Sequence, residues 1–370
     1  MESEIKVLMI IHGRHWNDTQ EQVYWLTKGL IEKGLNVHMA IARENTTLAE
    51  KLLQEEIPCH FYEKESSANF RINLNQHFRL AKIINKFSFD IVIAHSPQSL
   101  AHYIYAKPLI RRSPKLIFVK HAHIQTHWIA KVLKFQQAHK IVVVCDYQKE
   151  LLAKSNFLPQ KLTTIQSGLQ TDRFRPDPDR RKRTREKYSI RDDQKVFLNL
   201  SHWNTEAKGQ RHLIEAFSRV KDSNALLVMA GRDTQTKGCE IAKSLDVDQR
   251  VLCLGYQKRT MQLFDMADFY VHSPLIEGIA ESVIQAMLMG KVCLATLAGG
   301  IGSYLKDEIN GFAVPVGNYE LFTDKMEEMI ALSPERYKEL SDRARETGET
   351  FSFRFTVNEY YEMILQLMGG

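Results

Sequence analysis

The stretch from Ser273 to Gly300, SPLIEGIAESVIQAMLMGKVCLATLAGG, holds the densest set of residues that could do chemistry. Glu277 and Gly278 come shortly after the apolar run FYVH, and Gln285 lies two turns along the amphipathic segment that follows. If the run is a strand and the segment a helix, the helix N-terminus presents N–H groups that suit a phosphate or a sugar oxygen. Gly278 would let the backbone approach such a ligand closely. An acid that only complements the helix dipole would explain Glu277 alone.

Histidines in the N-terminal half form a second candidate set. His121 and His123 follow the apolar run LIFV, and His127 lies one helical turn further along. Three imidazoles at this spacing could hold a metal ion, but no matching cluster of carboxylate ligands accompanies them. We therefore expect no metal site, and a structural role for His123 and His127 is the simpler interpretation. His95 follows another apolar run, DIVIA, at a predicted strand end.

Short β-branched runs alternate with amphipathic stretches along the whole chain, which predicts an α/β fold with parallel sheets. Ligands bind beyond the carboxyl ends of such strands, so the loops after them should form the site. The spacing of Thr19 and Gln22 is that of a capping box, which predicts a helix that starts there and stops at Gly34. We expect strands at residues 6–11, 37–42, 59–62, 90–95, 116–119, 141–144, 162–165, 196–200, 226–230, 251–254, 269–272, 292–296 and 312–316.

The length of 370 residues predicts two domains, each able to bury its own core. Residues 171–194 contain turn breakers and the charge run RRKRTREK, and they precede a new series of strands. We therefore expect domains at 1–175 and 176–350, with a last helix at 351–370 that packs back toward the first domain. The charge run could bind a polyanion, but a solvated connecting helix is the interpretation that we favour.

The composition excludes several classes of protein. There are 50 Lys plus Arg and 44 Asp plus Glu, and the net charge of +6 is too modest and too evenly spread to indicate nucleic-acid binding. Five cysteines without a close pair are typical of a reducing compartment and argue against a disulfide framework. With no signal peptide and no apolar run of about 18 residues, we expect a cytoplasmic protein.

Residues 98–115, QSLAHYIYAKPLIRRSPK, mix Tyr103, Tyr105, Leu109 and Ile110 with lysines and arginines. Aromatic and basic side chains together suit peripheral contact with an anionic membrane, here the inner face of the plasma membrane. An ordinary helix that covers the sheet and has a solvated end explains the segment equally well. Both interpretations stay open.

The stretch 273–300 resembles the motif of two glutamates separated by seven residues in retaining family-4 glycosyltransferases of the GT-B fold. The resemblance extends along most of the chain. Lys208-Gly209 before HLIEAF, Leu254-Gly255-Tyr256, and residues 165–176 (IQSGLQTDRFRP) are similar to further family segments. It implies two Rossmann-like domains that face each other across a cleft, the first binding the acceptor and the second the nucleotide sugar.

The resemblance also implies roles for individual residues. Lys208 would grip the nucleotide diphosphate, Glu277 would bind hydroxyls of the transferred sugar, and Gln285 would stand where the family's ribose-binding glutamate lies. His121 matches a histidine near the acceptor and the C6 side of the sugar. The other implied donor-binding residues are His202, Gly209, Gly278, Ile279, Ala280, Gly13 and Thr19, and the acceptor-side residues are His95 and His123. No metal or other cofactor is implied.

Four positions depart from the family pattern. Histidine replaces an arginine, an Asp-Thr pair replaces two glycines and leaves Gly13 as the nearest glycine, and two glutamates are replaced by glutamine and serine. The residues concerned are His202, Asp18-Thr19, Gln285 and Ser303. They motivate the alternative of a degenerate GT-B protein that binds a nucleotide sugar or a partner without transfer. A metal-dependent hydrolase that uses the three histidines is a lesser alternative.

From these observations we expect a retaining glycosyltransferase that moves a hexose-like sugar from a nucleotide-diphosphate sugar to a glycan or a lipid-linked acceptor. By resemblance alone, the setting is the synthesis of bacterial cell-envelope polysaccharide, such as lipopolysaccharide or capsule.

Overall fold

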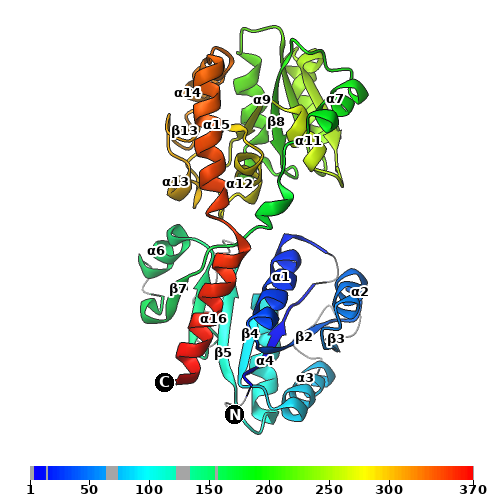
Figure 1. The fold of residues 1–370 in the computed structure, drawn as a ribbon, viewed down its shortest axis with the longest axis vertical. Coiled ribbons are helices and arrows are strands. Elements are labelled where there is room, and N and C mark those ends of the chain that lie inside the picture. Colours follow the sequence, from blue (N-terminus) through cyan, green and yellow to red (C-terminus); the bar gives the residue numbers. More distant parts are fainter. Residues whose placement is uncertain (1–3, 14–15, 64–73, 122–133, 155–156, 370) are drawn as a thin grey trace. The chain divides into compact units, whose positions relative to one another are not determined.

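A computed structural model describes residues 4–13, 16–63, 74–121, 134–154 and 157–369 of the chain. The chain divides into two compact units, one formed by Met1–Leu169 with Phe353–Gly370 and the other by Gln170–Ser352. Each unit contains one parallel β-sheet with helices around it (Figure 1). The predicted α/β fold is confirmed, and each expected strand range overlaps a strand of the structure.

The first unit has a seven-stranded sheet in the order β3-β2-β1-β4-β5-β6-β7. Its strands are β1 (Lys6–Ile10), β2 (Asn36–Ala42), β3 (Cys59–Glu63), β4 (Ile91–Ala94), β5 (Lys115–Lys120), β6 (Lys140–Val143) and β7 (Leu162–Thr164). Its main helices are α1 (Asp18–Glu32), α2 (Thr46–Gln54), α3 (Leu74–Phe87), α4 (Pro97–Ala106), α6 (Asp146–Lys154) and α16 (Phe353–Gly369), with a short 3₁₀ helix, η2 (Lys107–Leu109), after α4.

The central strand β1 shows why this sheet must be covered on both faces. Val7 and Met9 belong to the cluster that contains α1 and α16, whereas Leu8 and Ile10 belong to the cluster that contains α3 and α4. Successive side chains of a strand point to opposite faces, so an uninterrupted apolar run needs helices on each side. Only the edges and the strand ends remain for polar chemistry.

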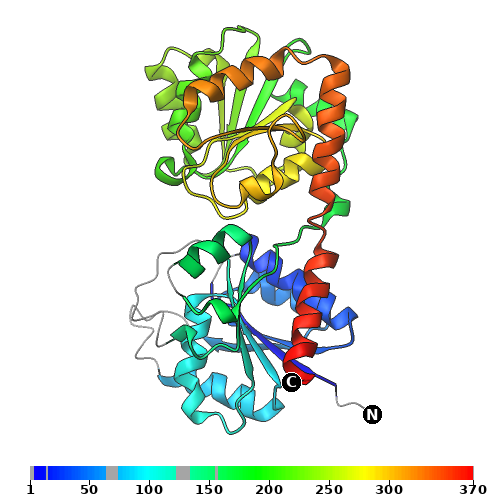
Figure 2. The same ribbon diagram turned by 90° about the vertical axis from the view of Figure 1, so that its left-hand side faces the viewer.

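The last helix belongs to the first unit, where α16 lies along α1 (Figures 1 and 2). The two helices touch at Gly29, where a Cβ atom would lie 2.3 Å from a methyl group of Val357. The helix begins with Phe353, whose N–H donates to the carbonyl of Leu169 over 2.9 Å. The division between the units thus lies at 169/170 and 352/353, beside the expected boundaries of 175 and 350.

The first helix begins slightly before its predicted start. Asn17 is the N-cap of α1, and its side chain accepts a hydrogen bond from the N–H of Gln20. The capping-box prediction at Thr19 is wrong because an asparagine two residues earlier, a residue type that is an equally good N-cap, takes that role. Thr19 is therefore within the first turn of α1 rather than at its cap.

The second unit has a six-stranded sheet in the order β10-β9-β8-β11-β12-β13. Its strands are β8 (Lys195–Leu200), β9 (Ala225–Ala230), β10 (Val251–Gly255), β11 (Phe269–His272), β12 (Val292–Thr296) and β13 (Phe312–Val314). Its main helices are α7 (Pro178–Lys187), α8 (Thr205–Lys208), α9 (Gln210–Ser218), α10 (Cys239–Ser244), α11 (Met261–Met266), α12 (Glu281–Leu288), α13 (Ile301–Tyr304), α14 (Tyr319–Ile330) and α15 (Pro334–Glu349).

The charge run RRKRTREK forms α7, but one of its faces is not solvated. Arg181 and Arg185 both pair with Asp268, at 2.7 and 3.5 Å, and Arg180 pairs with Asp265. Arg185 is buried and also donates to the carbonyls of Met266 and Gln194. The expectation of a solvated helix is therefore corrected, because three of its arginines hold the helix against α11 and the start of β11.

We predict that Arg185→Leu destabilises the second unit by about 3 kcal/mol, because it leaves buried carbonyls without a donor and removes one partner of Asp268. Urea denaturation at pH 7 measures this loss. Arg183→Leu, on the exposed side of the same helix, is the control and should change the free energy of unfolding by less than about 0.5 kcal/mol. Equal effects of the two substitutions would contradict an internal role for Arg185.

Candidate functional site

Three residues of the second unit meet at the Glu277 carboxylate. Its Oε2 lies 2.6 Å from Nζ of Lys208 and 3.1 Å from Nε2 of His272. Its Oε1 accepts a hydrogen bond of 2.9 Å from the N–H of Gly278. Lys208 ends α8, which follows β8, whereas Glu277 follows β11. These strands are neighbours at the point where the strand order reverses, and open α/β sheets bind their ligands at such points.

The loops after β8 and β11 approach closely because of a glycine. Gly209 has a φ of 62°, and a Cβ atom there would lie only 2.1 Å from the carbonyl oxygen of Ser273. The N–H groups of Leu275 and Ile276 both donate to the carbonyl of Ala207, at 2.8 and 3.0 Å. These bonds join the two loops and place the lysine beside the glutamate.

The loop after β12 closes the site from the other side. Gly299 has a φ of 61°, and a Cβ atom there would lie 2.0 Å from the carbonyl oxygen of Glu277. The N–H of Gly300 donates to the carbonyl of Gly278 over 2.6 Å. The backbone that carries Glu277 is therefore held between two other loops, which limits the movement of its side chain.

The Glu277 carboxyl is ionised at neutral pH. Burial raises its pKa, but the hydrogen bonds and charges of His272 and Lys208 outweigh burial and lower the pKa to about 2. The side chain is 11% exposed and that of Lys208 is 20% exposed, so a ligand can still reach both. The site thus offers a cation for a phosphate and a fixed acceptor for hydroxyl groups.

The predicted donor residues of the second unit are mostly brought together. Lys208, Gly209, Glu277 and Gly278 lie at the loops described above, and Ile279 and Ala280 are buried just before α12. Ala280 has a φ of 54°, and no described side chain caps the helix that it precedes. The start of α12 is therefore open to an anion or a hydroxyl.

The other predicted donor residues are not among the contacts of Glu277 described above. Gln285 is half-buried in the second turn of α12, and His202 is exposed in the loop after β8. The carbonyl of His202 accepts a bond of 2.6 Å from the Gln210 side chain, which holds its loop in place. Gly13 and Thr19 belong to the first unit.

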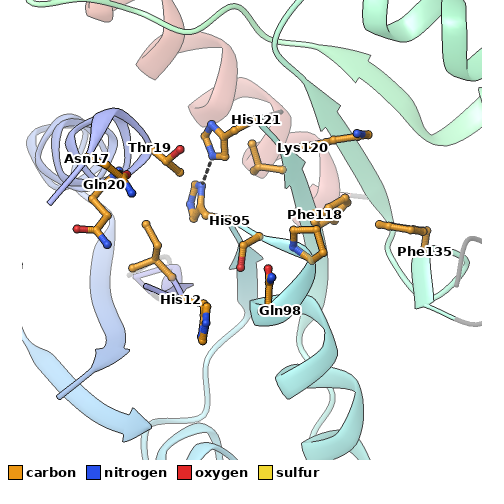
Figure 3. A pocket seen from close by; sticks show the side chains of 14 residues that line it. His12, Asn17, Thr19, Gln20, His95, Gln98, Phe118, Lys120, His121 and Phe135 are labelled. Atoms are coloured by element: carbon orange, nitrogen blue, oxygen red, sulfur yellow. Dashed lines mark hydrogen bonds between the residues drawn. The ribbon is translucent and has the colours of Figure 1, made fainter. Parts of the chain in front are cut away.

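A second site candidate is a pocket of about 200 Å³ in the first unit, beyond the ends of β1, β4 and β5 (Figure 3). His95 and His121 face each other there, with 3.3 Å between Nδ1 of His95 and Nε2 of His121. Residues at the start of α1 line one side of the pocket. The rings of Phe118 and Phe135 line another side. Further lining residues are Ile11, His12, Asn17, Thr19, Gln20, Ser96, Pro97, Gln98, Phe118, Val119, Lys120 and Phe135.

The two histidines act as neutral hydrogen-bonding groups. Burial and the neighbouring His121 ring hold the pKa of His95 well below the usual value for histidine, and burial lowers the pKa of His121 to about 4. At neutral pH one ring nitrogen of each is a donor and the other an acceptor. Such groups suit an uncharged polar ligand.

His123 and His127 lie outside the described residues. Within residues 4–13, 16–63, 74–121, 134–154 and 157–369, no three or more His, Cys, Asp or Glu side chains gather in a way that could hold a metal ion.

Comparison with known protein families decides the class of the protein. The sequence model of the family "Glycosyl transferases group 1" matches residues 180–347. The sequence model of the family "Glycosyltransferase Family 4" matches residues 20–173. The two matches together cover most of the chain. It belongs to the family-4 glycosyltransferases. The fold of this glycosyltransferase is GT-B, with one parallel sheet in each unit.

Relatives and solved structures agree with this assignment. EpsD of Bacillus subtilis (strain 168) is 27% identical over 305 residues, which cover 78% of this glycosyltransferase and 79% of EpsD. The UDP-Gal:alpha-D-GlcNAc-diphosphoundecaprenol alpha-1,3-galactosyltransferase of Escherichia coli is 19% identical over 272 residues, covering 67% and 68% of the two chains. HepE from Anabaena, in a crystal structure with UDP and glucose, has a similar fold with a TM-score of 0.84, 15% identity and coverage of 98% and 100%.

Sequence reasoning missed two residues of this glycosyltransferase. His272 lies inside the expected strand FYVH, where only its place next to the Glu277 loop could have drawn attention to it. Gln20 is 1% exposed at the start of α1, and neither atom of its amide has a hydrogen-bond partner among the described residues. Its sequence position gives no such signal, because the residue also fits the first turn of a helix.

We predict that His121 makes the stability of the first unit depend on pH. Its pKa of about 4 in the folded protein lies below the usual value of about 6.5, so the unfolded chain binds the proton first. The free energy of unfolding should therefore fall as the pH drops from 6.5 to 4, and His121→Asn should remove on the order of 1–3 kcal/mol of that fall. Urea denaturation at several pH values measures it. A fall that is the same size in His121→Asn as in the wild type would contradict this role of His121.

Proposed function

We propose that this glycosyltransferase is a retaining enzyme that transfers a hexose-type sugar from a nucleotide-diphosphate sugar to a glycan or a lipid-linked acceptor. The observation that carries the proposal is the ion pair between Lys208 and Glu277, whose side chain is only 11% exposed, beside the start of α12. In such a donor the diphosphate is bonded directly to the sugar. The Lys208 cation, which suits the diphosphate, likewise lies directly beside the Glu277 carboxylate, which suits the sugar hydroxyls. The HepE structure, which contains UDP and glucose, supports this choice of donor class.

Each half of the donor has its own partners in this proposal. Lys208 and the N–H groups at the start of α12 bind the diphosphate, which gains negative charge as the glycosidic C–O bond breaks. Glu277 accepts hydrogen bonds from hydroxyls of the transferred sugar. Gln285 donates and accepts hydrogen bonds at the ribose, where an amide serves without charge.

The transfer step needs no nucleophile from the protein. The acceptor oxygen forms the new bond to the anomeric carbon on the face from which the phosphate departs. The departing phosphate oxygen takes the proton of the acceptor hydroxyl, so the charge of the leaving group is neutralised as it forms. No metal or other cofactor takes part in this mechanism, because Lys208 stabilises the diphosphate.

The pocket of the first unit provides the acceptor side. Its neutral His95 and His121 can bind hydroxyl groups, as can the amide of Gln20, which has no hydrogen-bond partner among the described residues. Phe118 and Phe135 line the apolar side of the pocket (Figure 3). The E. coli relative acts on a sugar linked to diphosphoundecaprenol. This likeness supports a lipid-linked glycan as acceptor and cell-envelope polysaccharide synthesis as the setting.

The basic and aromatic segment 98–115 supports a peripheral membrane contact in this proposal. Tyr105, Leu109, Arg111 and Arg112 are exposed, and on the neighbouring α3 so is Phe78. Two expected members of the surface, Tyr103 and Ile110, are instead part of the core. None of the described helices is both long and apolar enough to pass through a bilayer. A contact with the cytoplasmic face would bring the enzyme to a lipid-linked acceptor.

Replacing Lys208 by alanine should lower the rate of transfer or donor hydrolysis by about 100- to 1000-fold, the loss typical of deleting one group that stabilises a developing anion. The assay follows release of the nucleoside diphosphate from UDP-, GDP- and ADP-glucose. Lys243→Ala, at an exposed position on α10, should keep full activity. A wild-type protein that binds these donors without consuming them would instead support the degenerate, binding-only alternative, which His202 and Gln285 motivate.

Reversing the charges of Arg111 and Arg112 to glutamate should weaken binding to vesicles of phosphatidylserine and phosphatidylcholine. Each basic side chain near an anionic surface contributes on the order of 1 kcal/mol, and this contribution falls with added salt. Vesicle flotation at low and high salt measures it, with donor hydrolysis in solution as the check on folding. Flotation that the reversal leaves unchanged would disprove the membrane contact.

A further inference from the structure

One of the three groups that contact the Glu277 carboxylate is His272, the last residue of β11. Its ring is 1% exposed, and its Nε2 lies 3.1 Å from the same Oε2 that Lys208 contacts. An ionised carboxylate only accepts hydrogen bonds, so Nε2 must carry the proton and donate it. The pair is therefore a hydrogen bond with a defined direction, from the strand to the glutamate.

The other ring nitrogen makes no competing hydrogen bond. Nδ1 is buried and has no hydrogen-bond partner among the described residues. The bond from Nε2 to Glu277 is therefore the one that holds the ring among these residues. The charged and titratable groups close to the ring are Glu277 and, beyond it, Lys208, with the phenol of Tyr270 at 6.4 Å between ring centroids.

His272 and Lys208 differ in how firmly they hold the carboxylate. The lysine side chain is 20% exposed, long and flexible, and a bound diphosphate attracts its ammonium group. The imidazole is buried at the end of a central strand, between β8 and β12, and has few rotamers to occupy. When Lys208 turns toward a diphosphate, His272 and the N–H of Gly278 still hold the two oxygens of Glu277.

We propose that His272 is a positioning residue that fixes the Glu277 carboxylate for recognition of the donor sugar while Lys208 binds the diphosphate. This inference rests on the proposed function. With one oxygen held by the imidazole and the other by the Gly278 N–H, the remaining lone pairs point in fixed directions. A carboxylate held in this way distinguishes sugars by the direction of their hydroxyls, because a wrongly placed hydroxyl leaves a buried acceptor unpaired.

Three substitutions of His272 test this role. His272→Leu removes the hydrogen bond and should lower the turnover of UDP-, GDP- or ADP-glucose, whichever the wild type consumes, by about 10- to 100-fold, as expected for one bond to a charged group. His272→Gln places an amide nitrogen near the position of Nε2 and should restore most of the rate. The side chain of His272→Asn is too short to reach Glu277, so this variant should resemble leucine.

Two further measurements separate positioning from a merely structural role. The dissociation constant of the free nucleoside diphosphate, measured by calorimetry, should stay within about threefold of the wild-type value in all three variants. The hydrogen bond that is removed joins His272 to Glu277, and neither residue binds the phosphates in this proposal. The ratio of rates with the glucose donor and its galactose epimer should fall toward one in His272→Leu. In a Glu277→Gln background, His272→Leu should cause little further loss, because its effect passes through that side chain.

His212 offers a matched control. Its Nδ1 lies 3.1 Å from Oε2 of Glu215, the same kind of pair at the same distance, but on the surface of α9. His212→Leu should leave turnover and the epimer ratio unchanged. If the wild type consumes none of the three donors, the proposed function fails and this inference fails with it. If the wild type is active and His272→Leu keeps its rate and epimer ratio, or glutamine restores no more than asparagine, the inference alone is overturned.

Discussion

Parallel strands impose the constraint on which the rest of this protein depends. A parallel sheet must be covered by helices on both faces, because its strands are apolar on each side, as Val7 to Ile10 of β1 are. Polar residues that must meet a ligand are then confined to the carboxyl ends of the strands. Both candidate sites follow this rule, since the histidine pocket lies beyond β1, β4 and β5 and the Glu277 site beyond β8 and β11.

Within the second unit, the decisive interaction is the one that keeps a carboxylate ionised at 11% exposure. Burial alone would favour the protonated acid, and two donors on Oε2 with a third on Oε1 reverse that preference. Those donors can converge only because Gly209 and Gly299 allow three loops to touch. Backbone geometry, loop contact and charge therefore depend on one another, and a change in any of them alters the surroundings of the Glu277 carboxylate.

The strands and the Glu277 motif could be predicted from the sequence because each depends on neighbours in the chain: apolar runs form strands, and the residues after them form the loops at the strand ends. Contacts between distant segments could not be predicted. The burial of Arg185 depends on Asp268, 83 positions later. That the Gln20 amide has no partner among the described residues becomes evident only when the surrounding side chains are placed. The cap at Asn17 was missed for a different reason, because two nearby polar residues compete for one helix start.

Two of the residues that depart from the family pattern differ in their contacts from the residues that match it. His202 is exposed, and Ser303 donates to the carbonyl of Gly300 within its own turn. By contrast, Lys208, Gly209 and Glu277 are joined by contacts that each require the others. A buried carboxylate that needs a lysine and a histidine is costly to keep, and apolar residues could fill the same space at less cost. A chain that had lost its ligand would have no reason to retain this arrangement. The intact charged centre therefore favours a site that still binds its ligand, and the departures at His202 and Ser303 leave the contacts of this centre unchanged.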